Sequence, residues 1–132
     1  MTIKPNKTCL VLDLDDTLYK EYDYQTSGLS YVESKLSDTY GMELNNHLIN
    51  LRDKGVNDIF TETIELLGLS EESKESLISL YRNHMPKIKL NEETQDFMTS
   101  IKSDFNKVLI LTDGRSYSQR LKLKALGLMN IP

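Results

Sequence analysis

Two short apolar runs stand apart from a chain whose hydrophobic positions otherwise recur at helical spacing. The first run covers residues 9–12 and is followed by Asp13. The second starts at Lys107 and ends at Thr112. Apolar runs bounded by polar turns are typical of strands buried on both faces of a parallel sheet. The pattern predicts an α/β fold with polar residues at the carboxyl ends of its strands, where open α/β sheets bind ligands.

Between these strands the apolar residues recur every three or four positions, as they do in amphipathic helices. Gly or Pro follows each apolar group, and Asn or Ser precedes two of the groups, which is the usual arrangement at helix boundaries. Four helices are expected, before Gly41, before Gly55, between Asn57 and Gly68, and between Ser70 and Pro86. They would form a small bundle over residues 22–86.

Two more helices belong with the strands. Asn91 is expected to cap a core helix that carries Phe97, Met98 and Ile101, and a last helix should run from about Ser116 to Leu126, with Gly127 as its stop. We therefore expect a core formed by residues 1–21 and 87–132, interrupted by the helical insert 22–86.

The composition points to an ordinary soluble domain. The 132 residues are 39% hydrophobic and 27% charged, and the net charge is −4 with a pI near 5.2. These values do not indicate a positively charged surface for binding nucleic acid or a membrane. The basic residues between Arg115 and Lys124 are interpreted as a solvated helix face. The single Cys9 excludes an internal disulfide and is expected to be buried in its strand. We find no signal peptide or membrane span, so a cytoplasmic location is expected.

The chemistry concentrates just after the first strand, where Asp13, Asp15 and Thr17 follow at intervals of two. Two acids this near to each other repel, and a metal ion or a shared proton usually offsets the repulsion. An exposed acidic turn is the plain alternative. A P-loop NTPase would need a glycine-rich loop upstream, and no Gly precedes Asp13. The acid spacing does not match a phospho-accepting receiver domain.

The run from Cys9 to Lys20 resembles the first motif of the haloacid dehalogenase (HAD) superfamily of phosphotransferases, in which Asp-x-Asp-x-Thr follows a hydrophobic strand. The run from Lys107 to Arg115 resembles the second HAD motif, a strand closed by Ser or Thr and continued by Asp-Gly. Residues 119–128 are similar to the helix that follows in cap-bearing HAD phosphatases. The resemblance implies a HAD-like Rossmannoid parallel sheet, incomplete here, with an all-helical cap of about four helices that closes over the catalytic edge.

The resemblance also implies roles for the two acids. Asp13 would be the nucleophile that forms an aspartyl-phosphate. Asp15 would be the general acid and base, protonated when substrate is bound, with a pKa raised above that of a free Asp. Mg²⁺ is the implied metal, held by the Asp13 carboxylate and the Asp15 backbone carbonyl. An acid at position 15 fits phosphatases and sugar-phosphate mutases, whereas dehalogenases and ion pumps of the superfamily lack it. Asp16 is interpreted as a turn residue.

The remaining implied residues bind the substrate phosphate. Thr17 would help to orient Asp15, and Thr112 would donate its hydroxyl to the phosphate. The backbone N–H groups of Leu14 and Asp113 would complete the cradle, and Gly114 would let the chain turn close to it. Tyr19, Glu21, Tyr22, Asp23 and Tyr24 lie at the entrance to the insert. The tyrosines among them are expected to pack between cap and core, and contact with the leaving group of a substrate is the alternative.

Two HAD motifs have no match. The third supplies a Lys and the fourth supplies acidic metal ligands, and both normally follow the helix that should end here at Leu126; Lys122 and Lys124 come too early to match. A fragment of a longer phosphatase is the favoured interpretation, and a natural truncation is the alternative. The parent would be a Mg²⁺-dependent phosphomonoesterase for a small phosphate ester, a sugar phosphate or a nucleotide. A sugar-phosphate mutase and a non-catalytic phosphate- or partner-binding module remain open. The 132-residue chain itself is expected to have little or no activity.

Overall fold

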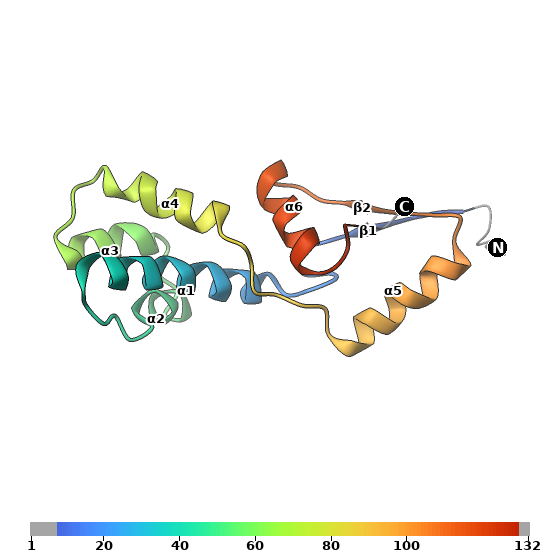
Figure 1. Ribbon diagram of the computed structural model, residues 1–132, viewed down its shortest axis with the longest axis horizontal. Coiled ribbons are helices and arrows are strands. Elements are labelled where there is room, and N and C mark those ends of the chain that lie inside the picture. The colour runs from blue at the N-terminus through green and yellow to red at the C-terminus, as the bar shows by residue number, and fades with distance from the viewer. Residues whose placement is uncertain (1–7, 130–132) are drawn as a thin grey trace. The chain divides into compact units, whose positions relative to one another are not determined.

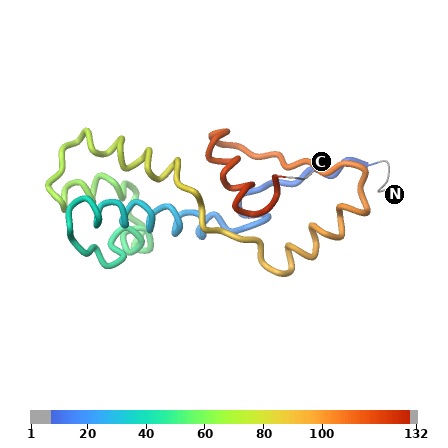
Figure 2. The backbone as a smooth tube through the Cα atoms, viewed as in Figure 1, coloured from blue at the N-terminus to red at the C-terminus, as the bar shows by residue number. Residues whose placement is uncertain are grey.

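The structure is a computed structural model that describes residues 8–129, and it has the expected α/β composition (Figure 1). In chain order the elements are β1 (Cys9–Asp13), α1 (Glu21–Tyr40), α2 (His47–Asp53), α3 (Ile59–Leu67), α4 (Ser73–Asn83), α5 (Glu92–Asp104), β2 (Lys107–Leu111) and α6 (Ser116–Ala125). The chain forms two compact units. Unit 1 comprises Met1–Asp23 and Met85–Pro132, and unit 2 comprises Tyr24–His84. The tube in Figure 2 follows the chain out of β1 into α1, and from α4 on to α5.

In unit 1, β1 and β2 pair in parallel, and the register runs from Cys9 opposite Lys107 to Asp13 opposite Leu111. Because both strands point the same way and end at paired residues, the segments that follow them emerge at the same edge of the sheet. The loop after β1 and the loop after β2 are thereby neighbours, although 98 positions separate their paired residues (111 − 13 = 98). This pairing is the step that gathers the two sequence motifs.

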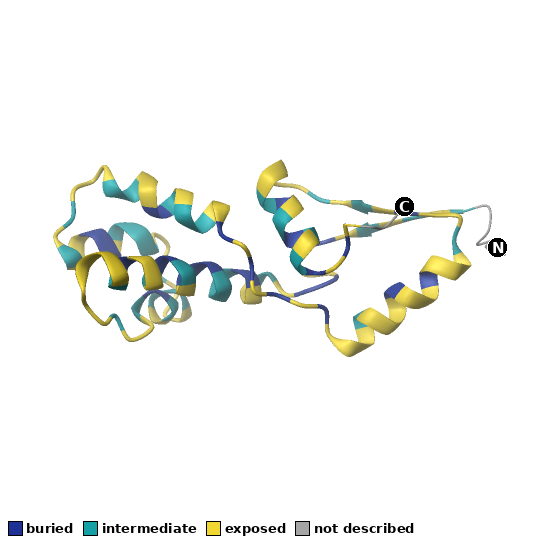
Figure 3. Cartoon of the chain, in the orientation of Figure 1, coloured by how far each residue is buried: buried dark blue, intermediate teal, exposed yellow. Residues whose placement is uncertain are grey.

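The two faces of this sheet differ in burial. Val108 is buried and its neighbours on the same face are half-buried, whereas Val11, Leu109 and Leu111 on the other face are 53%, 42% and 70% exposed (Figure 3). The prediction that the strands are buried on both faces is therefore wrong, and so is the prediction of a buried Cys9, which is exposed. The physical reason is that the described residues supply no layer to cover that second face.

The helices of unit 1 follow the sequence pattern closely. Asn91 caps α5, since its side-chain oxygen accepts from Thr94 N at 2.8 Å. Met98 and Ile101 are buried, but Phe97 is 46% exposed and is not part of the core, contrary to the prediction. The end of α6 is followed by Gly127 with φ 74°, in the left-handed conformation that stops a helix.

Unit 2 contains four helices whose facing sides bury one apolar cluster. The cluster comprises Leu29, Val32 and Leu36 from α1, Leu48 from α2, Ile64 from α3 and Leu77 from α4. All six belong to the apolar positions whose recurrence every three or four residues predicted the four helices. None of the helices within residues 8–129 combines the length and the hydropathy needed to span a membrane.

The helix boundaries in unit 2 differ slightly from the predicted ones. Helix α2 starts at His47, because Asn45 and Asn46 have φ values of 49° and 61°, which a right-handed helix does not accommodate. Asp58 caps α3 in place of Asn57 and accepts from Thr61 N at 3.2 Å. Helix α4 ends at Asn83, ahead of Pro86. Differences of this size are expected where local capping decides the ends of a helix.

Candidate active site at the carboxyl ends of the strands

A tight turn carries the chain from β1 to α1 and positions the acidic motif. The Leu14 carbonyl accepts from Leu18 N at 3.0 Å and from Thr17 N at 3.2 Å. Asp16 lies in the left-handed region with φ 59°, and its carboxylate accepts from Glu21 N at 2.8 Å, at the first residue of α1. Asp16 is therefore a turn residue, as predicted, and it also satisfies the start of α1.

Asp13 lies beside an open hollow of about 610 Å³, lined by Val11, Asp13, Leu111, Thr112 and Asp113. Its carboxylate is exposed, and the Thr17 hydroxyl donates to it at 3.3 Å. The predicted contact of Thr17 with Asp15 is not formed, because the turn aims Thr17 back at the residue four positions earlier. The hollow thus brings Asp13 of the first motif together with Thr112 and Asp113 of the second.

The carboxylate of Asp15 is engaged by three side chains of unit 1. Lys122 Nζ donates to Oδ1 at 2.9 Å, Gln119 Nε2 donates to Oδ2 at 3.0 Å, and the Tyr19 hydroxyl also bonds Oδ1. Lys122 is only 5% exposed and Gln119 only 6%. Both carboxylate oxygens of Asp15 therefore accept hydrogen bonds, from donors on α6 and from Tyr19 in the segment between β1 and α1.

Glu21 is the second acid of this cluster. The Tyr19 hydroxyl lies 2.8 Å from Glu21 Oε2, and Lys122 Nζ lies 3.4 Å from the same oxygen. The Tyr19 hydroxyl carries one hydrogen, so it can donate to only one of these two carboxylates at a time. We define the Asp15 cluster as Asp15, Tyr19, Glu21, Gln119 and Lys122.

The pKa values in the Asp15 cluster follow from these contacts. Burial by itself would raise the pKa of Asp15, but hydrogen bonds led by those from Tyr19 and Lys122 lower it to about 2. Burial, and then the hydrogen bond with Asp15, raise the pKa of Glu21. Burial and the two carboxylates hold the pKa of Tyr19 far above its ordinary value, so Tyr19 remains a donor. The pKa of Asp15 is lowered because a cation and several donors contact its carboxylate, and the raised pKa predicted for the substrate-bound state stays a prediction.

Gln119 was not identified from the sequence. Lys122 was considered there only as a residue too early to match the third-motif Lys, in a basic stretch assigned to solvent. Their spacing carried a signal: Gln119, Lys122 and Leu126 recur at intervals of three and four, which places them on one side of a helix. All three are buried. A Gln and a Lys on the buried, otherwise apolar side of a helix indicate that polar groups of the packed neighbour bond to them.

Gln119 also reaches the second motif. Its Nε2 donates to the Asp113 carbonyl at 3.0 Å and to the Thr112 hydroxyl oxygen. A Cβ at Gly114 would lie 3.4 Å from Gln119 Cδ, and Gly114 has φ 127°. Gly114 is therefore required for its backbone conformation, whereas a Cβ there would make only an ordinary van der Waals contact with the Gln119 amide.

The described residues offer oxygen donors of the kind Mg²⁺ takes at this strand edge, but no complete set of protein ligands. Among residues 8–129 no three His, Cys, Asp or Glu side chains gather as a metal site, and Asp13 takes part in no salt bridge there. Mg²⁺ is commonly bound through one or two carboxylates while it keeps several waters and contacts substrate phosphate. The exposed Asp13 carboxylate beside the hollow provides this kind of oxygen donor.

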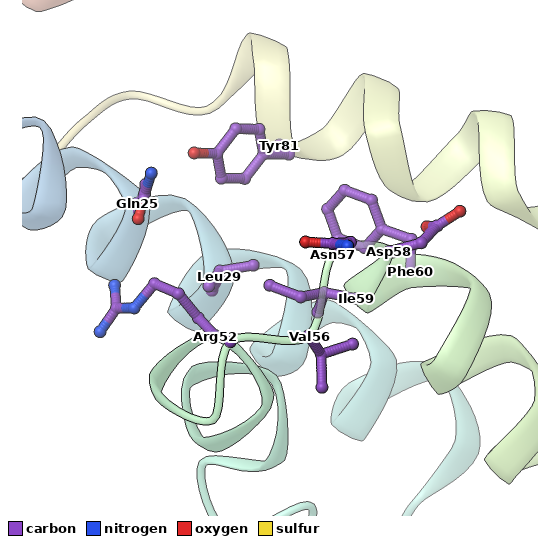
Figure 4. A pocket seen from close by; sticks show the side chains of 10 residues that line it. Gln25, Leu29, Arg52, Val56, Asn57, Asp58, Ile59, Phe60 and Tyr81 are labelled. Carbon is purple, nitrogen blue, oxygen red and sulfur yellow. The ribbon is translucent and has the colours of Figure 1, made fainter.

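A second hollow, of about 410 Å³, lies within unit 2 and is shown in Figure 4. Leu29, Ile59, Phe60 and Tyr81 contribute apolar and aromatic walls. Its Arg52 guanidinium is already bound to Asp53 at 3.1 Å and to the Thr26 hydroxyl. Asp58, the acid in its lining, is paired with Lys74 at 2.6 Å.

Comparison with known proteins identifies the fold. No family model matches the sequence, and no curated protein matches it. Among solved structures, the chain is similar to YfnB of Bacillus subtilis, assigned as a HAD-hydrolase and crystallised with magnesium, with 17% identity and a TM-score of 0.54 over 93% of this chain. It is also similar to a protein from Clostridium difficile assigned as a phosphatase, with 14% identity and a TM-score of 0.55 over 94% of this chain. The chain spans 60% and 57% of the lengths of these two proteins. It therefore has part of the α/β fold of the HAD-hydrolases.

Proposed function

We propose that this chain carries the catalytic edge of a Mg²⁺-dependent phosphomonoesterase that works through an aspartyl-phosphate. One observation carries the proposal. The exposed Asp13 carboxylate shares a hollow with the Thr112 hydroxyl, and Asp15 follows two residues later in the same turn. Phosphoryl transfer requires a nucleophile, a group that donates a hydrogen bond to the phosphate, and an acid, and all three lie at this strand edge.

In the first half-reaction an Asp13 oxygen attacks the phosphorus of the ester. The bond from phosphorus to the leaving oxygen breaks, and the proton of the Asp15 carboxyl passes to that oxygen, which departs as an alcohol. The phosphoryl group remains on Asp13. Thr112 donates its hydroxyl to a phosphoryl oxygen, with help from the backbone N–H groups of Leu14 and Asp113.

In the second half-reaction the Asp15 carboxylate takes a proton from water while the water oxygen attacks the phosphorus. The bond between phosphorus and Asp13 then breaks, inorganic phosphate leaves, and both acids return to their starting states. When bound, Mg²⁺ would neutralise charge on the phosphoryl oxygens, held by the Asp13 carboxylate and the Asp15 backbone carbonyl. The Asp15–Lys122 ion pair must open for the acid step, since the carboxylate is otherwise kept ionised.

The substrate we propose is a small phosphate ester, such as a sugar phosphate or a nucleotide, and unit 2 would act as the cap that selects it. A sugar-phosphate mutase is the close alternative. In that reaction the phosphoryl group passes from Asp13 to a second sugar hydroxyl in place of water. Conversion of hexose phosphates without release of inorganic phosphate would identify the mutase.

The test is hydrolysis of p-nitrophenyl phosphate with and without Mg²⁺, by the 132-residue chain and by any longer polypeptide that contains it. After rapid quenching, mass spectrometry of the wild-type protein should show the gain of one phosphoryl group. Asp13→Asn should abolish both this gain and turnover. Asp104→Asn, an exposed acid at the end of α5, is the matched control. Turnover that is unchanged in Asp13→Asn would exclude the covalent mechanism.

The Asp15 cluster favours a second candidate for the chain taken alone, a non-catalytic phosphate-binding module. Lys122 contacts the acid and not Asp13, and no salt bridge neutralises Asp13 within the described part of the chain. Loss of one electrostatic group at a phosphoryl-transfer site costs on the order of a hundredfold in rate. We therefore expect the 132-residue chain to turn over little or no ester. Isothermal titration with inorganic phosphate and Mg²⁺ would detect binding that occurs without turnover.

A further inference from the structure

We propose that Gln119 is a positioning residue that fixes the acid Asp15 and the phosphate-binding Thr112 relative to each other through a single side-chain amide. The proposal rests on the function proposed above and adds a residue that neither motif contains. Gln119 is 6% exposed, and its Nε2 meets Asp15 Oδ2 and the Asp113 carbonyl at 3.0 Å each, together with the Thr112 hydroxyl oxygen.

The three acceptors come from both strand ends. Asp15 follows β1, whereas Thr112 and Asp113 follow β2, so the amide ties together the two loops that the parallel register makes neighbours. An amide nitrogen carries only two hydrogens, so three acceptors compete for them. A small movement of Gln119 would therefore disturb both groups assigned to the chemistry.

The uncharged amide suits an acid that changes its protonation state during the reaction. An N–H donor bonds the oxygen of a carboxylate, and it also bonds the carbonyl oxygen of the protonated acid. Gln119 can therefore hold Oδ2 of Asp15 in both half-reactions. Lys122, one helical turn later, contacts Oδ1 as an ammonium group and favours the ionised form alone.

The structure also fixes Gln119 itself. Its backbone N–H donates to the Arg115 carbonyl at 2.9 Å in the first turn of α6. A buried side chain with bonded neighbours and a defined backbone loses little further freedom when it positions another group.

The first experiment measures the contacts in the 132-residue chain without any need for turnover. In ¹⁵N-labelled protein, the Gln119 side-chain N–H₂ signals are assigned by their loss in Gln119→Met. We expect them to lie away from the positions of exposed glutamines and to move in both Asp15→Asn and Thr112→Val. Signals at ordinary exposed positions, or a response to only one of the two variants, would overturn the bridging role.

The second experiment measures the consequence in whichever polypeptide shows Asp13-dependent turnover. Phenyl phosphate has a poor leaving group that needs a proton, and p-nitrophenyl phosphate has a good one that needs little help. Gln119→Met should lower kcat for phenyl phosphate about tenfold to a hundredfold, the range expected for a mispositioned acid, and lower kcat for p-nitrophenyl phosphate far less. Arg120→Met, the exposed neighbour on α6, is the control and should leave both rates unchanged.

The outcomes separate this inference from the proposed function. Equal losses on the two esters, or no loss, would overturn the role of Gln119 while leaving the phosphatase proposal intact. Wild-type protein without any Asp13-dependent turnover would overturn the phosphatase proposal, and the role of Gln119 in its chemistry with it, whatever the side-chain signals show.

Discussion

Replacing Lys122 with Met removes the only ammonium group in the Asp15 cluster and keeps most of the apolar stem. In the wild-type chain Lys122 Nζ lies 2.9 Å from Asp15 Oδ1 and 3.4 Å from Glu21 Oε2. The side chains of Asp15 and Glu21 are 29% and 32% exposed, whereas that of Lys122 is 6% exposed. The variant therefore leaves two partly buried acids around the Tyr19 hydroxyl without a cation.

Two estimates bound the cost. With an effective dielectric constant of 20, the two Coulomb interactions are worth about 6 and 5 kcal/mol, before the several kcal/mol that dehydration of the ammonium costs. The loss of stability cannot exceed the cost of protonating Glu21, because the variant can take up a proton there and remove the charge. Protonation costs about 1.36 kcal/mol per pH unit above the ordinary Glu pKa of 4.5. At pH 7.5 this upper limit is about 4 kcal/mol, and at pH 5.0 it is about 1 kcal/mol.

The expected pH dependence has a definite sign. Removal of Lys122 raises the pKa of Glu21 in the folded state still further. A raised folded-state pKa contributes stability that is present below the unfolded pKa and is lost as the pH rises through the folded value. Lys122→Met should therefore lower the free energy of unfolding by about 2–4 kcal/mol at pH 7.5 and by about 1 kcal/mol or less at pH 5.0.

Urea denaturation of the 132-residue chain at the two pH values, followed by circular dichroism, measures these differences. Lys124→Met is the matched control, since Lys124 lies on the exposed side of the same helix and should change the free energy of unfolding by at most about 0.5 kcal/mol. Adding Glu21→Gln to Lys122→Met should recover much of the loss at pH 7.5. A loss of equal size at both pH values, or one no larger than that of the control, would refute the ion-pair reasoning.

Three further changes test other parts of the structure. Asn91→Ala removes the cap of α5 and should lower the free energy of unfolding by about 1 kcal/mol in urea. Gly28→Ala places a methyl group against the Tyr81 ring, and should lower it by about 1–3 kcal/mol, whereas Ser30→Ala on the exposed side of α1 should not. The lowered pKa of Asp15 contributes stability above about pH 3.8 that is lost as the pH falls toward 2, so acid titration of Asp15→Asn should show a smaller loss across that interval.

The sequence predicted the elements whose signals are local. Apolar runs and the residues that bound them located β1 and β2, and glycines marked the ends of the helices, since φ is 63° at Gly41 and 66° at Gly68. The gathering of Asp13 and Thr112 was also predictable, because parallel strands place their carboxyl ends at one edge. Both inferences depend only on residues close together in the chain and on one rule of sheet topology.

The parts that were wrong depend on what packs against a residue. Cys9 and Phe97 lie at apolar positions whose pattern predicted burial, and both are exposed because no described segment covers them. Lys122 lies in a stretch rich in basic residues, which favours solvent as a local interpretation. Its burial depends on Asp15 and Glu21, more than 100 positions earlier, as the ion-pair partners that offset dehydration of the ammonium group.

The Asp15 cluster is also where the two proposed functions diverge. A phosphate that binds at Asp13 and Thr112 needs donors and a cation, and it does not need Asp15 to change state. Ester cleavage does need that change, because a carboxylate with a cation 2.9 Å away has no proton to give. A bound phosphate ester brings negative charge toward Asp15, which favours its protonated form and weakens its pairing with Lys122. Glu21 already shares that ammonium group and can retain it when Asp15 is neutral. The cluster therefore contains a second carboxylate that can hold Lys122 while Asp15 is protonated, which the proposed catalytic role of Asp15 would use.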